Sequence, residues 1–110
     1  MPNIKIFVDD TQLDAISERL TAGLPGLREM ICRDLEVSRS ACQFAIIGVK
    51  GMPEQPTINF ELGYIRRPDR TPELCLATAQ RIRERMLEIT GLPAAIRMSP
   101  IEAVGYVTLK

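Results

Sequence analysis

The chain has 110 residues, enough for one hydrophobic core but too few for two. Lys and Arg together number 14, as do Asp and Glu, so the formal net charge is zero. This balance argues against a protein that binds nucleic acid or an anionic membrane through its charge. The sequence also lacks the run of about 18 apolar residues that a membrane-spanning helix requires.

We expect a cytoplasmic protein, because no signal peptide is recognisable and the cysteines suggest a reducing compartment. Cys32, Cys42 and Cys75 are odd in number and lack C-x-x-C spacing, so they are predicted to be buried free thiols. We therefore expect neither nucleic acid nor a membrane as a partner.

The absence of histidine narrows the possible chemistry. It excludes a Ser-His-Asp triad, a Cys-His pair and any metal site with histidine ligands. The glycine-rich nucleotide-binding motifs are missing as well, so we expect no metal and no cofactor. A catalytic proton would have to be carried by Asp, Glu, Lys, Tyr, Cys or the terminal amine.

The first half of the chain predicts a strand, a helix and a second strand. Residues 2–8, PNIKIFV, alternate apolar and polar side chains, as a half-buried strand does. Thr11-Gln-Leu-Asp14 then signals a helix start, and apolar residues recur at helical spacing as far as Leu35. The segment 23–26, Gly-Leu-Pro-Gly, is expected to break or kink this helix, because proline lacks the backbone donor. Residues 42–49, CQFAIIGV, are apolar on both faces and predict a central strand.

The second half repeats this order. Residues 56–62, PTINFEL, match residues 2–8 position by position, from proline to the last apolar residue. Thr71 is a suitable helix cap, with Pro72 and Glu73 in the first turn. The helix should end near Thr90, because Gly91 follows, and residues 94–98 predict a short last strand.

The predicted fold is therefore α+β, with two layers in a single domain, residues 1–110. Its two β-α-β halves, about 2–50 and 56–108, would form a four-stranded mixed sheet with both helices on one face. The other face would mix polar and apolar side chains, which suits a subunit interface. Its expected residues are Lys5, Phe7, Gln43, Ala45, Ile47, Asn59, Glu61, Ile65 and Arg97.

A Met-Pro start followed by two tandem β-α-β halves resembles the tautomerase superfamily. This group includes macrophage migration inhibitory factor (MIF), malonate semialdehyde decarboxylase and 4-oxalocrotonate tautomerase (4-OT). Residues 64–73, YIRRPDRTPE, resemble the strand end and Arg-Pro-Arg turn of the decarboxylase branch, with Asp69 in place of the second arginine. FELGYIRRPD and SPIEAVGYV are more similar still to a poorly characterised bacterial branch, in which an arginine likewise follows the third strand.

The resemblance implies a cofactor-independent homotrimer in which Met1 is removed and Pro2 acts as general base or acid. A terminal secondary amine in an apolar, cation-lined pocket loses its proton more readily, so its pKa falls toward neutrality. Arg67 would hold a substrate carboxylate and stabilise an enolate, with Arg66 and Arg70 as competing helpers. Tyr106 would be an aromatic residue of the substrate pocket. The substrate would be a small keto or enol carboxylate.

Other interpretations remain open from the residues alone. No arginine follows the first strand, where VDDTQ stands, so decarboxylation and hydration are alternatives to tautomerisation. The three arginines could form a solvated turn with neighbouring carboxylates, and Tyr106 could serve packing. If Met1 is retained, the nitrogen of Pro2 is an amide and carries no proton. The alternative function is a non-catalytic oligomeric module that binds a ligand or a protein.

Overall fold

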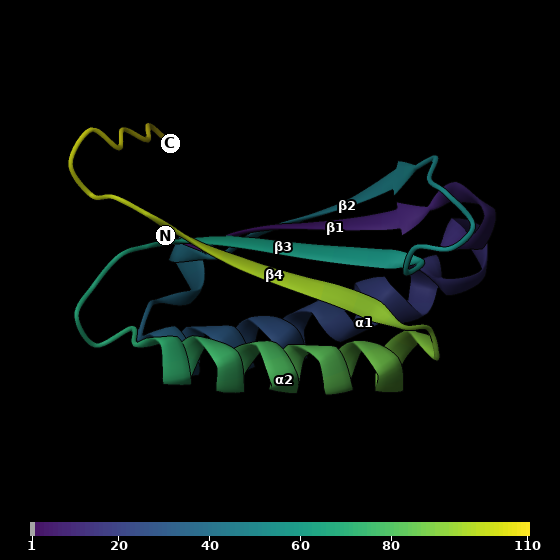
Figure 1. The fold of residues 1–110 in the computed structure, drawn as a ribbon, viewed down its shortest axis with the longest axis horizontal. Coiled ribbons are helices and arrows are strands. Elements are labelled where there is room, and N and C mark those ends of the chain that lie inside the picture. Colours follow the sequence, from purple (N-terminus) through teal and green to yellow (C-terminus); the bar gives the residue numbers. More distant parts are fainter. Residues whose placement is uncertain (1) are drawn as a thin grey trace.

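Within residues 2–110, four strands and two long helices lie in two layers (Figure 1). The structure is a computed structural model and describes residues 2–110. In chain order the elements are β1 (Asn3–Asp9), α1 (Asp10–Leu35), a 3-10 turn η1 (Arg39–Ala41), β2 (Gln43–Val49), β3 (Ile58–Ile65), α2 (Pro72–Thr90) and β4 (Ala94–Ile101). The predicted α+β fold with both helices on one face of the sheet is confirmed.

The sheet is mixed, with the strand order β2-β1-β3-β4. β1 pairs with β2 in parallel and with β3 in antiparallel orientation, and β3 pairs with β4 in parallel. The prediction that residues 42–49 form a central strand is wrong, because β2 lies at the edge of the sheet. Its apolar composition on both faces is therefore unexplained by the contacts within one chain.

The core lies between the sheet and the helices. The repeated strands β1 and β3 lie side by side at the centre of the sheet, where Ile4 pairs with Leu62 and Ile6 with Phe60. These four side chains are at most 1% exposed, and apolar side chains of α1 and α2 cover them. The helical residues most deeply buried are Ile16, Leu20, Leu27, Ile31, Leu35, Ile82 and Met86.

The predicted ends of α2 are confirmed, whereas the predicted start of α1 is not. α2 has the expected cap, because the Thr71 hydroxyl accepts a hydrogen bond from the N–H of Leu74 at 3.1 Å. It ends at Gly91, which has a left-handed φ of 72°. α1 starts earlier than predicted, since the carboxylate of Asp9 accepts from the Thr11 N–H at 3.0 Å.

α1 continues through Pro25, so of the predicted break or kink the break does not occur. Residues on both sides of the proline, Leu20 and Leu27, are buried against the same core, and this packing stabilises the helix despite the missing hydrogen bond. The two glycines face α2: a Cβ atom on Gly23 would lie 2.6 Å from Cδ1 of Ile89. The Gly-Leu-Pro-Gly segment thus serves close helix packing.

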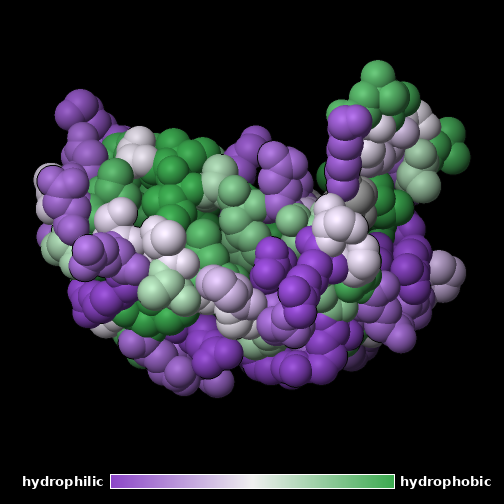
Figure 2. Space-filling model, turned by 180° about the vertical axis from the view of Figure 1, so that it is seen from behind, coloured by the Kyte–Doolittle hydropathy of each residue, from purple (hydrophilic) through white to green (hydrophobic). Residues whose placement is uncertain are grey.

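The second face of the sheet carries no helix, as predicted. Figure 2 shows apolar side chains gathered at the β2 side of the molecule and on the projecting C-terminal tail. The tail exposes Val104 and Leu109 almost completely and Val107 to 78%. Within residues 2–110, neither helix is long and apolar enough to cross a membrane.

Candidate active site

The topology brings Pro2 to the end of the sheet at which the arginine-rich turn begins. Pro2 is buried, and its carbonyl accepts a hydrogen bond from the N–H of Gln43 at 3.2 Å. Asn3 pairs with Gly63 in the antiparallel register, so one further step sets Pro2 opposite Tyr64. The chain then leaves β3 at Ile65 and enters the turn that carries the three arginines.

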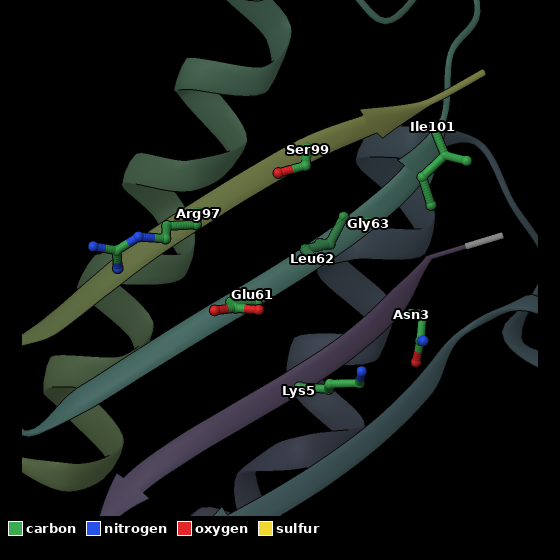
Figure 3. A pocket seen from close by; sticks show the side chains of 8 residues that line it. All are labelled: Asn3, Lys5, Glu61, Leu62, Gly63, Arg97, Ser99 and Ile101. Carbon is green, nitrogen blue, oxygen red and sulfur yellow. The ribbon is translucent and has the colours of Figure 1, made fainter. Parts of the chain in front are cut away.

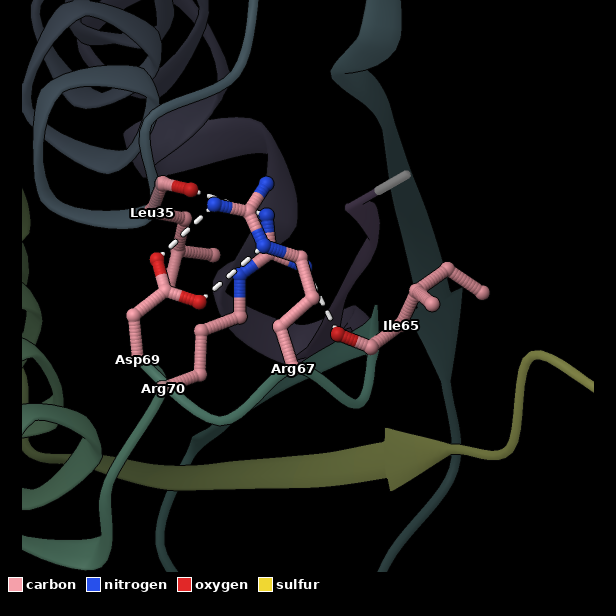
Figure 4. Close-up of polar contacts among 5 residues, drawn as sticks. All are labelled: Leu35, Ile65, Arg67, Asp69 and Arg70. Atoms are coloured by element: carbon pink, nitrogen blue, oxygen red, sulfur yellow. Dashed lines mark hydrogen bonds and ion pairs between the residues drawn. The ribbon is translucent and has the colours of Figure 1, made fainter.

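Arg67 is held on the surface by a carboxylate of its own turn (Figure 4). Its Nε and Nη2 donate to the two oxygens of Asp69 at 3.0 and 2.8 Å. This pairing lowers the pKa of Asp69 and raises that of Arg67. Arg66 makes a similar exposed pair, in which its Nε lies 2.6 Å from Oε1 of Glu102. Both guanidinium groups are thus solvent-accessible but already paired.

Arg70 has a different environment, because only 7% of it is exposed. Its Nη1 donates to the carbonyl of Ile65 at 2.6 Å, and its Nη2 donates to the carbonyl of Leu35 at 2.8 Å (Figure 4). Burial and the neighbouring charge of Arg67 lower the pKa of Arg70. The side chain therefore joins the end of α1 to the end of β3 and fixes the turn between them.

Tyr64 and Cys75, neither of which was a predicted site residue, lie at the same end of the sheet. The hydroxyl of Tyr64 accepts a hydrogen bond from the thiol of Cys75 at 3.2 Å. Burial raises the pKa of Tyr64, and the bond to Cys75 adds to this effect. β3 extends past the predicted residues 56–62, and its alternation places Tyr64 on the core side.

Tyr106 lies in the tail after β4, partly buried, and its N–H donates to the carbonyl of Ala103 at 3.3 Å. β4 runs parallel to β3, so the tail leaves the sheet at the end where Pro2 lies. The structure thus brings the predicted site residues to one end of the sheet.

A hollow of about 360 Å³ lies on the bare face of the sheet and reaches the end at which Pro2 lies, because Asn3, Gly63 and Ile101 line it. The strand register sets Glu61 between Lys5 and Arg97, and Figure 3 shows these side chains on adjacent strands. Asn59 donates to Glu61 at 2.8 Å and accepts from Arg97. Among residues 2–110, no three acidic or thiol side chains are grouped closely enough to hold a metal ion.

Comparison with known proteins identifies the fold. A fused 4-OT, described as an asymmetric trimer, superposes with a TM-score of 0.77 at 10% identity, over 96% of this chain and 91% of that one. The MIF-like protein of Entamoeba histolytica gives 0.70 at 9% identity, over 98% and 95% of the two chains. The chain has the tautomerase fold.

A third match extends the similarity. N1, a member of the cis-3-chloroacrylic acid dehalogenase family, gives a TM-score of 0.73 at 14% identity, over 96% of this chain and 79% of that one. No protein-family description and no curated protein matches the sequence. The expected resemblance to the tautomerase superfamily is thus confirmed through the fold, and at these identities the match concerns the fold alone.

Proposed function

We propose that the protein is a tautomerase-superfamily enzyme that uses Pro2 as general base and acid on a small keto or enol carboxylate. The observation that carries the proposal is the position of Pro2. It directly precedes an inner strand of the tautomerase fold, is buried, and lies at the end of the sheet from which the arginine-rich turn leaves. Tautomerisation is the reaction that this arrangement supports best, and decarboxylation and hydration are alternatives on the same machinery.

The chemistry requires Pro2 to be a free amine, so Met1, which lies outside the described residues, must be removed. Pro2 is buried, and burial disfavours the protonated form of a terminal amine, which would lower its pKa. The neutral nitrogen then takes a proton from the carbon beside the substrate carbonyl, and the C–H electron pair moves to form an enolate. Return of that proton to another atom completes the tautomerisation without a cofactor.

Arg67 is the proposed electrophilic partner. Its two donors already hold the Asp69 carboxylate in the bidentate geometry that a substrate carboxylate would need. The substrate would therefore replace Asp69 as the partner of Arg67. Arg66 and Tyr106 are proposed to contact the substrate, and Arg70 adds positive charge from its fixed position.

We further propose a cytoplasmic homotrimer that assembles through the bare sheet face. Phe7, Ile47 and Ile65 place apolar surface on that face beside polar side chains. β2 is apolar on both faces although it is an edge strand, as expected of a strand that another subunit covers. The fused 4-OT with the same fold is described as a trimer, which supports this assembly.

A tautomerase assay with an enolic arylpyruvate tests the proposal. Wild type should accelerate ketonisation, and Pro2→Ala should lower the rate by about 10²-fold or more, as loss of a general base does. Arg67→Ala should also lower the rate, whereas Arg83→Ala, which removes an exposed arginine of α2, should not. Equal rates in all four proteins would overturn the proposal.

The non-catalytic binding module is the second candidate, favoured by a specific observation. Arg67 is already paired with Asp69, and β1 ends at Asp9 and is followed by Asp10, with no arginine there. The intact mass of the untagged protein separates the two candidates. A mass without one methionine leaves Pro2 free to act, whereas retention of Met1 would block the proposed base and favour the binding module.

A further inference from the structure

Two cysteine thiols from different elements meet beside β2. Cys32 lies in the last turns of α1, and Cys42 directly precedes β2. Their sulfur atoms are 3.1 Å apart, about 1 Å more than the length of a disulfide bond. The short turn η1 creates this approach, because the N–H of Cys42 donates to the carbonyl of Arg39 at 3.1 Å.

We propose that Cys32 and Cys42 form a reversible dithiol–disulfide couple that a peroxide oxidises. Both thiols are free and only partly buried, so a small oxidant can reach them. Cys75 lacks this arrangement, since its thiol donates to the hydroxyl of Tyr64 rather than to a second sulfur. Cys32 and Cys42 are ten positions apart in the chain and no short motif joins them, so their sequence does not distinguish them from Cys75.

The oxidation proceeds in two balanced steps. The Cys32 sulfur attacks one oxygen of hydrogen peroxide, the O–O bond breaks, and the departing hydroxide takes up the thiol proton as water. The Cys42 sulfur then attacks the sulfenic acid on Cys32, and the hydroxyl leaves with the Cys42 proton as a second water. The two thiols lose two electrons to the peroxide.

Burial and the hydrogen bond with Cys32 raise the pKa of Cys42 to about 12, although the charge of nearby Arg28 acts in the opposite direction. Cys42 therefore keeps its proton at neutral pH until the pair is oxidised. The same disulfide and the same loss of two electrons result if the two sulfur atoms exchange roles, because their contact at 3.1 Å is mutual.

The disulfide would join two segments that hold the Pro2 end of the sheet. The residue after Cys42 is Gln43, whose N–H donates to the carbonyl of Pro2. On the other side, Cys32 lies one turn before Leu35, whose carbonyl binds Arg70. Closing the sulfur–sulfur distance draws the start of β2 toward α1, so oxidation stiffens this end. The thiol chemistry itself does not rest on the proposed function.

Thiol titration and mass spectrometry test the couple directly. The purified reduced protein is treated with hydrogen peroxide, and free thiols are counted under denaturing conditions. Wild type and Cys75→Ser should each lose two thiols and about 2 Da, and should yield one cross-linked peptide pair containing Cys32 and Cys42. A thiol reductant should restore both thiols. The oxidised protein should also unfold at a temperature higher by about 4 °C or more.

The single variants make the test decisive. Cys32→Ser and Cys42→Ser cannot form the bond, so neither should show the internal mass loss or the rise in unfolding temperature. Three results would overturn the proposal: gain of oxygen atoms by wild type without loss of thiol pairs, a cross-link that includes Cys75, or disulfides formed only between chains.

Discussion

Replacing Arg70 with methionine should destabilise the fold strongly, because this guanidinium connects two backbone ends. It donates to the carbonyls of Ile65 and Leu35 at 2.6 and 2.8 Å and is 7% exposed. A hydrogen bond from a charged donor contributes about 1.5–3 kcal/mol, so the two together contribute about 3–6 kcal/mol. Because methionine avoids the cost of burying a charge, we expect a net loss of about 3 kcal/mol.

Urea unfolding followed by circular dichroism measures this loss. Arg70→Met should lower the free energy of unfolding by that amount, a large part of the about 5–15 kcal/mol typical of a small domain. Arg70→Lys keeps the charge but cannot reach both carbonyls. Its free energy of unfolding should therefore lie between those of wild type and Arg70→Met. Arg67→Met is the matched control, because it removes an exposed arginine of the same turn and should change the midpoint little. Equal losses for Arg70→Met and Arg67→Met would refute the structural role of Arg70.

Three further predictions concern the oligomer, a helix cap and a buried phenol. Ile47→Glu on the bare sheet face should yield a monomer in light scattering, whereas Leu87→Glu on the exposed side of α2 should not. Asp9→Ala should lower the urea midpoint at pH 7, and this difference should shrink as the pH falls below 3.8, because capping lowers the pKa of Asp9 in the folded state. In Tyr106→Phe the remaining Tyr64 should form phenolate only above its ordinary pKa of 10.0, as ultraviolet titration would show. The free energy of unfolding should fall as the pH rises above 10.0, because Tyr64 binds its proton more tightly in the folded state than in the unfolded state.

The fold was predictable because its signals are local and repeated. The alternation in β1 and β3 determines which side chains enter the core, and Thr71 and Gly91 mark the ends of α2. Two predictions, the helix break at Pro25 and the central position of residues 42–49, were wrong because the outcome depends on contacts between distant segments. Pro25 stays within α1 because packing on both sides stabilises the helix, and β2 is an edge strand although its composition resembles that of an inner one.

The site was less predictable, because the environments of its side chains depend on distant partners. Arg66, Arg67 and Arg70 look equivalent in the sequence, yet only Arg70 is buried. Its partner Leu35 is 35 residues away, and no short motif encodes that contact. The pairing of Cys32 with Cys42 depends in the same way on how η1 turns the chain between α1 and β2.

The rate at which a small electrophile labels the N-terminus, measured against pH, tests the role of Pro2 most directly. Intact mass would first establish the N-terminal residue, and peptide mapping would locate the label. We predict that Pro2 is the N-terminus, that it reacts faster at neutral pH than a model peptide beginning with proline, and that its apparent pKa lies near the operating pH. An N-terminus that retains Met1, or a labelling rate no higher than that of the peptide, would contradict catalysis by Pro2.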